Sequence, residues 1–212
     1  MQDCLAVPGM AEAQRLYGRP ELREYDLGTC GDEDRFWEMW QKRQGEVALV
    51  IRRPDGRLVL QTKSFYPPGA FRLPTGGVKA GEDLLEAVRR EMREETGLEA
   101  SIVGFLGVLC YHFRRRGVPM VRASYVFLLE AGPEELWPQD GEERISGFRE
   151  AAPEELEGVA GQLERLAGEW AVWGRFRALV HRFVSEKVGV ESEASNVKRE
   201  TSPQASHVKR QV

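Results

Sequence analysis

Three glutamates near the middle of the chain are the residues whose types and spacing best suit catalysis. Glu91, Glu94 and Glu95 follow Arg90 directly in a segment free of proline. At about 100° per residue of helix, the three glutamates share an arc of roughly 100°. Carboxylates gathered in this way repel one another, and a hard divalent cation such as Mg²⁺ or Mn²⁺ removes the repulsion by binding their oxygens. The spacing therefore predicts a metal site. The alternative is a solvated helix with i to i+4 salt bridges, which is common in glutamate-rich segments.

The neighbours of these glutamates favour a buried, functional helix. Gly76, Gly77 and Gly81 precede it, and glycine lets the backbone approach a ligand closely or adopt positive φ. Gly97 stands where a helix C-cap is expected. Glu95 falls at the edge of an apolar stripe, where a carboxylate is costly unless a positive charge compensates it. The stripe consists of Leu84, Leu85, Val88 and Met92.

The whole segment from Gly76 to Leu98 fits the pattern G-x5-E-x7-R-E-U-x-E-E-x-G-U, where U is a bulky aliphatic residue. With all of its fixed positions matched, the chain resembles a Nudix hydrolase. The resemblance implies an enzyme that cleaves the diphosphate linkage of a nucleoside diphosphate joined to another group, with Mg²⁺ or Mn²⁺ as cofactor. The matched positions are Gly76, Glu82, Arg90, Glu91, Met92, Glu94, Glu95, Gly97 and Leu98.

The resemblance also implies roles for individual residues. Glu91, Glu94 and Glu95 bind metal, Glu82 joins the outer metal shell, and Arg90 holds a glutamate by an ion pair. Gly76 is counted with them as a metal-binding position. The general base varies within the family, and four glutamates stay open for that role. They are Glu130, Glu142, Glu143 and Glu150.

Elements that could position this site lie on both sides of the Gly76–Leu98 segment, which is called the box from here on. Residues 46–53 and 57–63 read as two strands around a Pro-Asp-Gly turn, and residues 101–113 and 121–130 as two more. Apolar residues on both sides of these strands favour a sheet covered by helices on both faces. The resemblance implies the same fold class, an α/β/α sandwich with a mixed β-sheet. Helices are expected over residues 153–166 and 169–187.

The domain organisation follows from these elements. We expect an N-terminal extension over residues 1–45, irregular apart from a short helix over residues 32–44, and the catalytic domain over residues 46–188. Residues 189–212 are polar and poor in aromatics, so we expect a disordered tail.

Candidate substrate contacts are arginines, because a guanidinium suits bidentate contact with phosphate. Arg72 lies just before the box, and Arg114, Arg115 and Arg116 lie at an expected hairpin tip. The alternative for the three consecutive arginines is a solvated turn. Tyr111 and Phe113 alternate along a strand and are candidates for a base pocket.

Composition limits the partners. The 212 residues carry a net charge of -4 with a pI near 5.6, which argues against a nucleic-acid duplex as a stable partner. The chain shows no membrane span or signal peptide, so we expect a cytoplasmic protein that acts on small nucleotide-type diphosphates. A homodimer is compatible with the sequence. Cys4, Cys30 and Cys110 show no paired spacing and are expected to be free thiols.

Two other functions fit this fold. A non-catalytic nucleotide sensor is the main alternative, although such modules usually carry a degraded box. An isopentenyl diphosphate isomerase would need a catalytic cysteine near the site, and Cys110 is the only cysteine in the core region.

Overall fold

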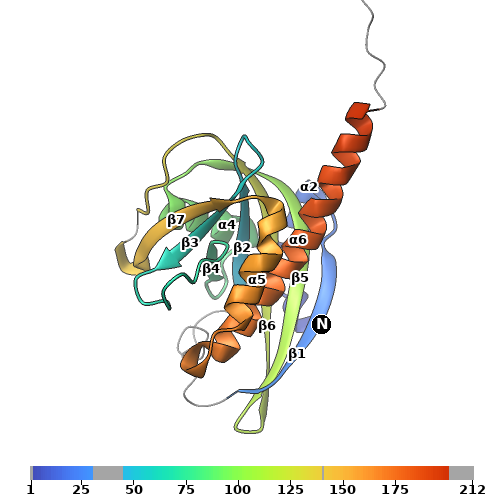
Figure 1. Cartoon of the computed structure of the whole chain (residues 1–212). Coiled ribbons are helices and arrows are strands. Elements are labelled where there is room, and N and C mark those ends of the chain that lie inside the picture. The colour runs from blue at the N-terminus through green and yellow to red at the C-terminus, as the bar shows by residue number, and fades with distance from the viewer. Residues whose placement is uncertain (1, 31–44, 140, 201–212) are drawn as a thin grey trace, which may run out of the picture.

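The computed structural model describes residues 2–30, 45–139 and 141–200, and the side chains from residue 4 to residue 188 within those ranges. Its centre is a seven-stranded sheet in the order β1-β5-β6-β2-β3-β7, with β4 paired to β2 (Figure 1). The β1–β5 and β2–β6 pairs are parallel and the other pairs antiparallel, which confirms a mixed sheet. The strands are β1 (Glu21–Cys30), β2 (Gly45–Arg52), β3 (Leu58–Lys63), β4 (Thr75–Val78), β5 (Ala100–Arg115), β6 (Val118–Ala131) and β7 (Ile145–Ala151).

Helices cover both faces of the sheet, so the α/β/α layering is confirmed. In Figure 1, α5 and α6 lie in front of the sheet and α4 lies behind it. Each layer buries its own hydrophobic cluster against the sheet. The helices of the rear layer are α1 (Gln2–Leu5), α2 (Met10–Tyr17) and α4 (Leu84–Thr96). Those of the front layer are α5 (Leu156–Glu164) and α6 (Ala171–Glu200), and short 3-10 turns are η1 (Gly141–Glu143), η2 (Pro153–Glu155) and η3 (Gly168–Trp170).

Helix α4 carries the box glutamates, and its ends are well defined. The side chain of Asp83 accepts hydrogen bonds from Leu85 N at 2.9 Å and from Glu86 N at 3.4 Å, which makes Asp83 the N-cap. Gly97 ends the helix with φ 69°, and its N–H donates to Arg93 O, as expected of a C-cap glycine. Both ends fix where along the sheet the glutamates project.

The N-terminal region is more ordered than the sequence predicted. Instead of irregular chain it forms α1, α2 and the edge strand β1. The prediction was wrong because the side chains of β1 are mostly polar and only partly buried, so the strand has no apolar periodicity. The helix expected over residues 32–44 lies outside the described residues.

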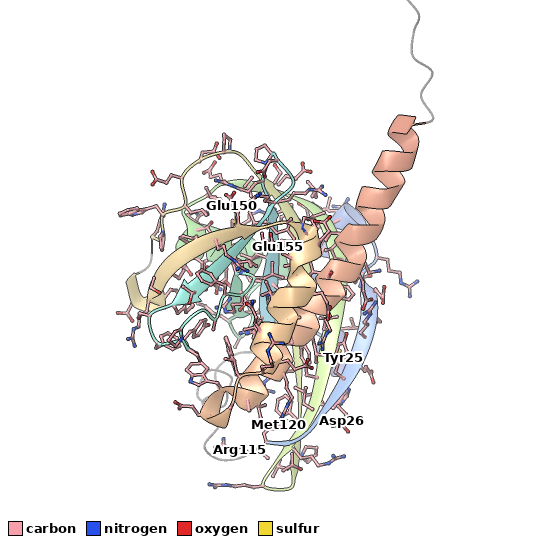
Figure 2. All side chains as sticks on the ribbon, viewed as in Figure 1. Tyr25, Asp26, Arg115, Met120, Glu150 and Glu155 are labelled. Carbon is pink, nitrogen blue, oxygen red and sulfur yellow. A yellow bond between two sulfur atoms is a disulfide. The ribbon has the colours of Figure 1, made fainter. Side chains whose placement is uncertain are left out.

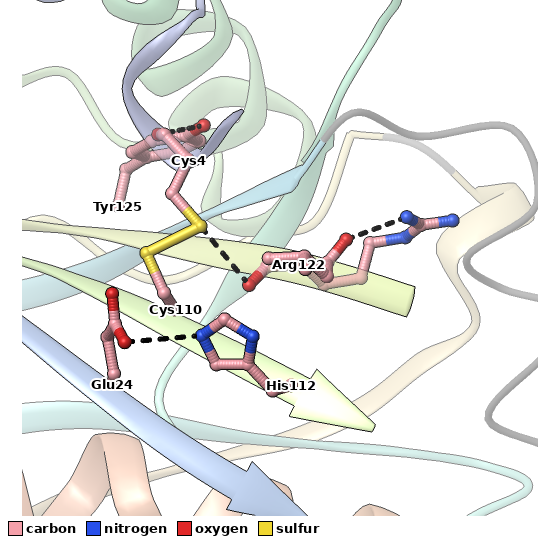
Figure 3. Close-up of a disulfide and its surroundings, with 7 residues drawn as sticks. Cys4, Glu24, Cys110, His112, Arg122 and Tyr125 are labelled. Atoms are coloured by element: carbon pink, nitrogen blue, oxygen red, sulfur yellow. Dashed lines mark hydrogen bonds and ion pairs between the residues drawn. A yellow bond between two sulfur atoms is a disulfide. The ribbon is translucent and has the colours of Figure 1, made fainter. Parts of the chain in front are cut away.

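A disulfide joins the N-terminal region to the sheet. Cys4 of α1 is bonded to Cys110 of β5 (Figure 3), and Tyr125 Oη donates to Cys4 O at 3.0 Å. The prediction of free thiols is therefore wrong for these two residues, while Cys30 is buried and takes no part in this disulfide. Because 106 residues separate the two cysteines, no short spacing motif indicated that they pair.

The C-terminal helix is longer than predicted. Helix α6 continues to Glu200 and projects beyond the sheet in Figure 1. The expectation of disorder from Gly189 onward is therefore wrong for residues 189–200, and residues 201–212 lie outside the described part of the chain. No helix within the described ranges has both the length and the apolar character needed to span a bilayer.

Candidate active site

Arg90, in the middle of α4, is the centre of an ion-pair network. Its Nε donates to Glu82 Oε1 at 2.7 Å, and its Nη1 donates to Glu91 Oε1 at 2.7 Å and to Glu94 Oε2 at 2.8 Å. Its Nη2 donates to the carbonyl oxygen of Gly77 at 2.8 Å. The planar guanidinium thus fixes three carboxylates and the β4 backbone relative to one another.

Glu95 is held by a different set of residues. It is fully buried, and its Oε2 accepts a hydrogen bond from Gln61 Nε2 at 2.8 Å. The Nζ of Lys63 lies 3.2 Å from Glu95 Oε1, and Arg72 Nη2 lies 3.9 Å from the same oxygen. These cations supply the compensating charge that a carboxylate in this position requires. Gln61 and Lys63 were missed from the sequence, because nothing in β3 identifies which of its side chains faces Glu95.

Gly76 provides the space for the carboxylate of Glu91. A Cβ built at Gly76 would overlap the carboxyl group of Glu91, so any larger residue in β4 would displace it. Glu91 is 4% exposed, and its buried Oε2 has no hydrogen-bond partner among the residues that the structure describes. Glycine is therefore needed here for close approach rather than for an unusual backbone angle.

Burial sets the charge state of these carboxylates. It raises the pKa of Glu91 to about 7, and repulsion from Glu95 adds to the rise while Arg90 opposes it. Burial alone would also raise the pKa of Glu82, but the hydrogen bonds from Arg90 and from Lys79 N–H lower it overall. Ionisation of Glu91 therefore lowers the stability of the folded state.

The carboxylate oxygens of this cluster are the type of ligand that a hard divalent cation prefers. Within the described ranges, the buried oxygens Glu91 Oε2 and Glu95 Oε1 accept no hydrogen bond, although Lys63 Nζ lies 3.2 Å from the latter. In the described part of the chain, however, no three His, Cys, Asp or Glu side chains converge closely enough to hold a metal ion. The physical reason is that Arg90 binds Glu91 and Glu94, whereas Lys63 binds Glu95.

Among the four glutamates left open as general base, Glu143 is joined to this cluster through Lys63. Its carboxylate is paired with Lys63 Nζ, the same group that contacts Glu95, and it raises the pKa of Glu91 through repulsion. Glu130 pairs instead with Arg52 in a surface contact. Glu150 pairs with Arg53, at the upper end of the molecule in Figure 2.

The candidate substrate arginines occupy two different environments. Arg72 is 1% exposed and donates to Tyr66 Oη at 3.0 Å and to Leu73 O at 2.7 Å, so it has almost no surface to offer a phosphate. The three arginines of the expected tip do lie there, Arg114 and Arg115 at the end of β5 and Arg116 in the turn. Figure 2 shows Arg115 at the lower end of the hairpin, remote from α4. The structure therefore does not bring these three arginines to the glutamates.

The two β5 residues that were candidates for a base pocket also lie outside the site. Tyr111 and Phe113 are 0% and 2% exposed and belong to the core beneath α6. Cys110 is bonded to Cys4, so it is not available as the catalytic thiol that an isomerase mechanism would need.

Comparison with known proteins assigns the family. The NUDIX domain model matches residues 42–195, more than half of the chain. Nudix hydrolase 6 of Arabidopsis thaliana is 34% identical over 48% of this chain and 32% of its own length. The ADP-ribose pyrophosphatase of Methanocaldococcus jannaschii is 41% identical over 50% of this chain and 60% of its own. The RNA pyrophosphohydrolase of Caulobacter vibrioides is 47% identical over 24% of this chain and 31% of its own length. The chain therefore belongs to the NUDIX family.

The matches to these relatives span less than two thirds of each relative's own length. Among solved structures, an Ap4A hydrolase binary complex of C. elegans aligns with a TM-score of 0.47 at 18% identity, over 70% of this chain and 98% of that one.

Proposed function

We propose that this protein hydrolyses the diphosphate linkage of a nucleoside diphosphate joined to another group, with Mg²⁺ or Mn²⁺ as cofactor. The observation that carries the proposal is the network in which Arg90 binds Glu82, Glu91 and Glu94 while Glu95 is buried beside them. A merely solvated helix would leave these carboxylates in water and would need neither Gly76 nor the buried Lys63. Relatives named pyrophosphohydrolase and ADP-ribose pyrophosphatase support the same reaction class.

The proposed roles follow from the donors on α4. Glu91, Glu94 and Glu95 would hold the metal, with Glu82 in its outer shell and Gly76 leaving room for the ligands. A bound divalent cation neutralises charge on the phosphoryl oxygens and the leaving group. Arg90 orients the carboxylates, and Arg72, which is buried against Tyr66 and Glu95, supports the position of Glu95 rather than binding phosphate.

We assign the general base to Glu143. Its carboxylate is partly exposed and paired with Lys63, so it is accessible to water while its position is fixed. It would take a proton from the water that attacks phosphorus. Replacing Glu143 with Gln should lower kcat and remove the acidic limb of its pH profile, whereas Glu130→Gln should change neither. An unchanged profile for Glu143→Gln would exclude this assignment.

The decisive experiment is a product-resolved screen of nucleoside triphosphates, dinucleotide polyphosphates, ADP-ribose and nucleotide sugars. At least one compound should be cleaved in Mg²⁺ or Mn²⁺, and a chelator should abolish the cleavage until metal is restored. Turnover that resists chelation would refute the metal proposal. Tight nucleotide binding without any turnover would favour the sensor function instead.

We propose a cytoplasmic location, which requires the Cys4–Cys110 pair to be reduced in the cell, because disulfides are rare in reducing compartments. Counting free thiols by mass spectrometry in protein alkylated during lysis tests the location. Full alkylation of all three cysteines is the result expected of a cytoplasmic protein.

A further inference from the structure

His181 of α6 is a buried histidine with both ring nitrogens in hydrogen bonds. Its side chain is 1% exposed. Its Nε2 lies 3.0 Å from Leu73 N, and its Nδ1 lies 2.7 Å from the carbonyl oxygen of Arg177. A backbone N–H donates and a carbonyl oxygen accepts, so these partners fix the tautomer in which Nδ1 carries the proton and Nε2 accepts. His181 therefore bridges α6 to the segment that leads into the box.

The surroundings of His181 keep its ring neutral. Burial is the main cause that lowers the pKa of His181 to about 4, and the positive charges of Arg177 and Arg72 act in the same direction, while the hydrogen bond to Arg177 O opposes them. Near neutral pH the ring thus keeps Nε2 as an acceptor for Leu73 N–H.

The peptide of Leu73 is tied in turn to the guanidinium of Arg72. Arg72 Nη1 donates to Leu73 O at 2.7 Å, and its Nε donates to Tyr66 Oη at 3.0 Å. Its Nη2 lies 3.9 Å from Glu95 Oε1. Leu73, Arg72 and Glu95 are all buried, so protein contacts rather than solvent decide where the guanidinium lies. A continuous path of contacts therefore runs from His181 through Leu73 and Arg72 to Glu95.

The backbone of this segment is held from two sides. Arg72 exchanges both of its backbone hydrogen bonds with Gln61 of β3, at 2.7 and 2.9 Å, which fixes it to the sheet. The next N–H, that of Leu73, is directed to His181 instead. Without this acceptor the N–H would be buried and unsatisfied, which is costly, so the peptide would turn to find another partner. Because Leu73 O is bonded to Arg72 Nη1, such a turn would move the guanidinium as well.

From this path we infer that His181 is a positioning residue for the metal site: it holds Leu73, and through Leu73 and Arg72 it fixes the carboxylate of Glu95 for the cation. The inference rests on the proposed function for the metal. It assigns a role in the site to α6, which lies on the face of the sheet opposite α4 (Figure 1). Residues that orient metal ligands commonly change metal affinity by about 10- to 100-fold when they are replaced.

The test measures Mn²⁺ binding to the full-length protein without substrate, from the electron paramagnetic resonance signal of free Mn²⁺. Two amide side chains separate the two hydrogen bonds of His181. In His181→Gln the amide oxygen reaches the position of Nε2 and accepts from Leu73 N–H, whereas the shorter His181→Asn reaches the position of Nδ1 and leaves Leu73 without its acceptor. His181→Asn should weaken Mn²⁺ binding by about tenfold, and His181→Gln should stay within about threefold of the wild type. Hydrogen exchange at the Leu73 amide should accelerate in His181→Asn and not in His181→Gln.

Val184→Ala is the matched control for a general loss of stability. Val184 is 0% exposed and lies one turn after His181 in α6. Its truncation removes buried apolar contacts from the same helix, so it should lower the thermal midpoint. The Mn²⁺ affinity of Val184→Ala, measured well below that midpoint, should equal that of the wild type.

Wild-type Mn²⁺ affinity or unchanged Leu73 exchange in His181→Asn would overturn the inference. A loss of affinity in His181→Gln as large as in His181→Asn would overturn it too, because the bond to Leu73 would then not be the cause. An equal loss in Val184→Ala would assign the effect to general destabilisation, with the same consequence. All of these outcomes leave the proposed function intact. Failure of the wild type to bind Mn²⁺ would instead remove the metal from the proposed function, and the role of His181 with it.

Discussion

Glu94 is the box carboxylate whose removal should report most directly on catalysis. Its side chain is partly exposed and forms an ion pair with Arg90, so its loss should disturb folding little. Replacing Glu94 with Gln should lower kcat by about 10² or more, as expected when charge stabilisation of the transition state is lost. Steady-state rates with saturating metal measure this, and Glu86→Gln on the exposed face of α4 is the control. Equal, small losses at both positions would contradict the site assignment.

Glu95→Gln should lower the rate as well, but it should also destabilise the fold. The neutral side chain would leave Lys63 and Arg72 buried beside one carboxylate fewer. Breaking a buried ion pair from one side costs about 3–5 kcal/mol. The thermal midpoints of Glu95→Gln and Glu94→Gln separate the effect on stability from the effect on rate. Equal midpoints for the two variants would show that the charge of Glu95 does not stabilise the fold.

Glu91 should make the metal-free protein less stable as pH rises. Because folding raises its pKa from an ordinary 4.5 to about 7, the folded protein keeps a proton that the unfolded chain loses between these values. Stability attributable to this group is therefore highest below pH 4.5 and is lost as pH rises through 7. The stability of Glu91→Gln relative to wild type should increase by about 3 kcal/mol between pH 4.5 and 8. Urea unfolding in chelator measures the change, and a pH-independent difference would refute it.

At the residue scale, the box glutamates could be recognised from the sequence because their spacing is local. The partner of Glu95 could not, because Lys63 lies far from α4 in the chain and reaches Glu95 only through the fold of the sheet.

Strand β4 should be intolerant of a side chain at Gly76. Replacing Gly76 with Ala would force Glu91 away from its position under Arg90, so we expect activity to fall at least about tenfold, since small misplacements of catalytic groups are costly. Gly147→Ala in β7 is the control, because its Cβ would meet only Thr62 Cγ2, at 3.7 Å. A Gly76→Ala enzyme with wild-type kcat would mean that the close packing of Glu91 is dispensable.

At the scale of elements, prediction succeeded where apolar patterns are strong and failed where they are weak. The fully buried strand β2 and the capped helix α4 follow from their residues. The edge strand β1 alternates between partly buried and exposed side chains, and pairing with β5 rather than local pattern decides its conformation.

For the whole molecule, the last part of α6 should be dispensable for folding. Val188 is 5% exposed and belongs to the core cluster beneath α6. Truncation after Val188 should shift the thermal midpoint by less than about 2 °C and leave the rate unchanged. Calorimetry and activity assays check both quantities. A loss of several degrees, or of turnover, would show that residues beyond 188 dock on the domain.

The bond between Cys4 and Cys110 closes the chain into a covalent ring that contains α4 and most of the sheet. The turn after β2 lies within this ring, and Arg57 there is exposed enough for a protease to reach. A single tryptic cut after Arg57 would therefore open the ring without separating its pieces. Electrophoresis of such nicked protein should show one band of full mass without reductant and two fragments with it, so that limited digestion has no visible effect until the disulfide is reduced.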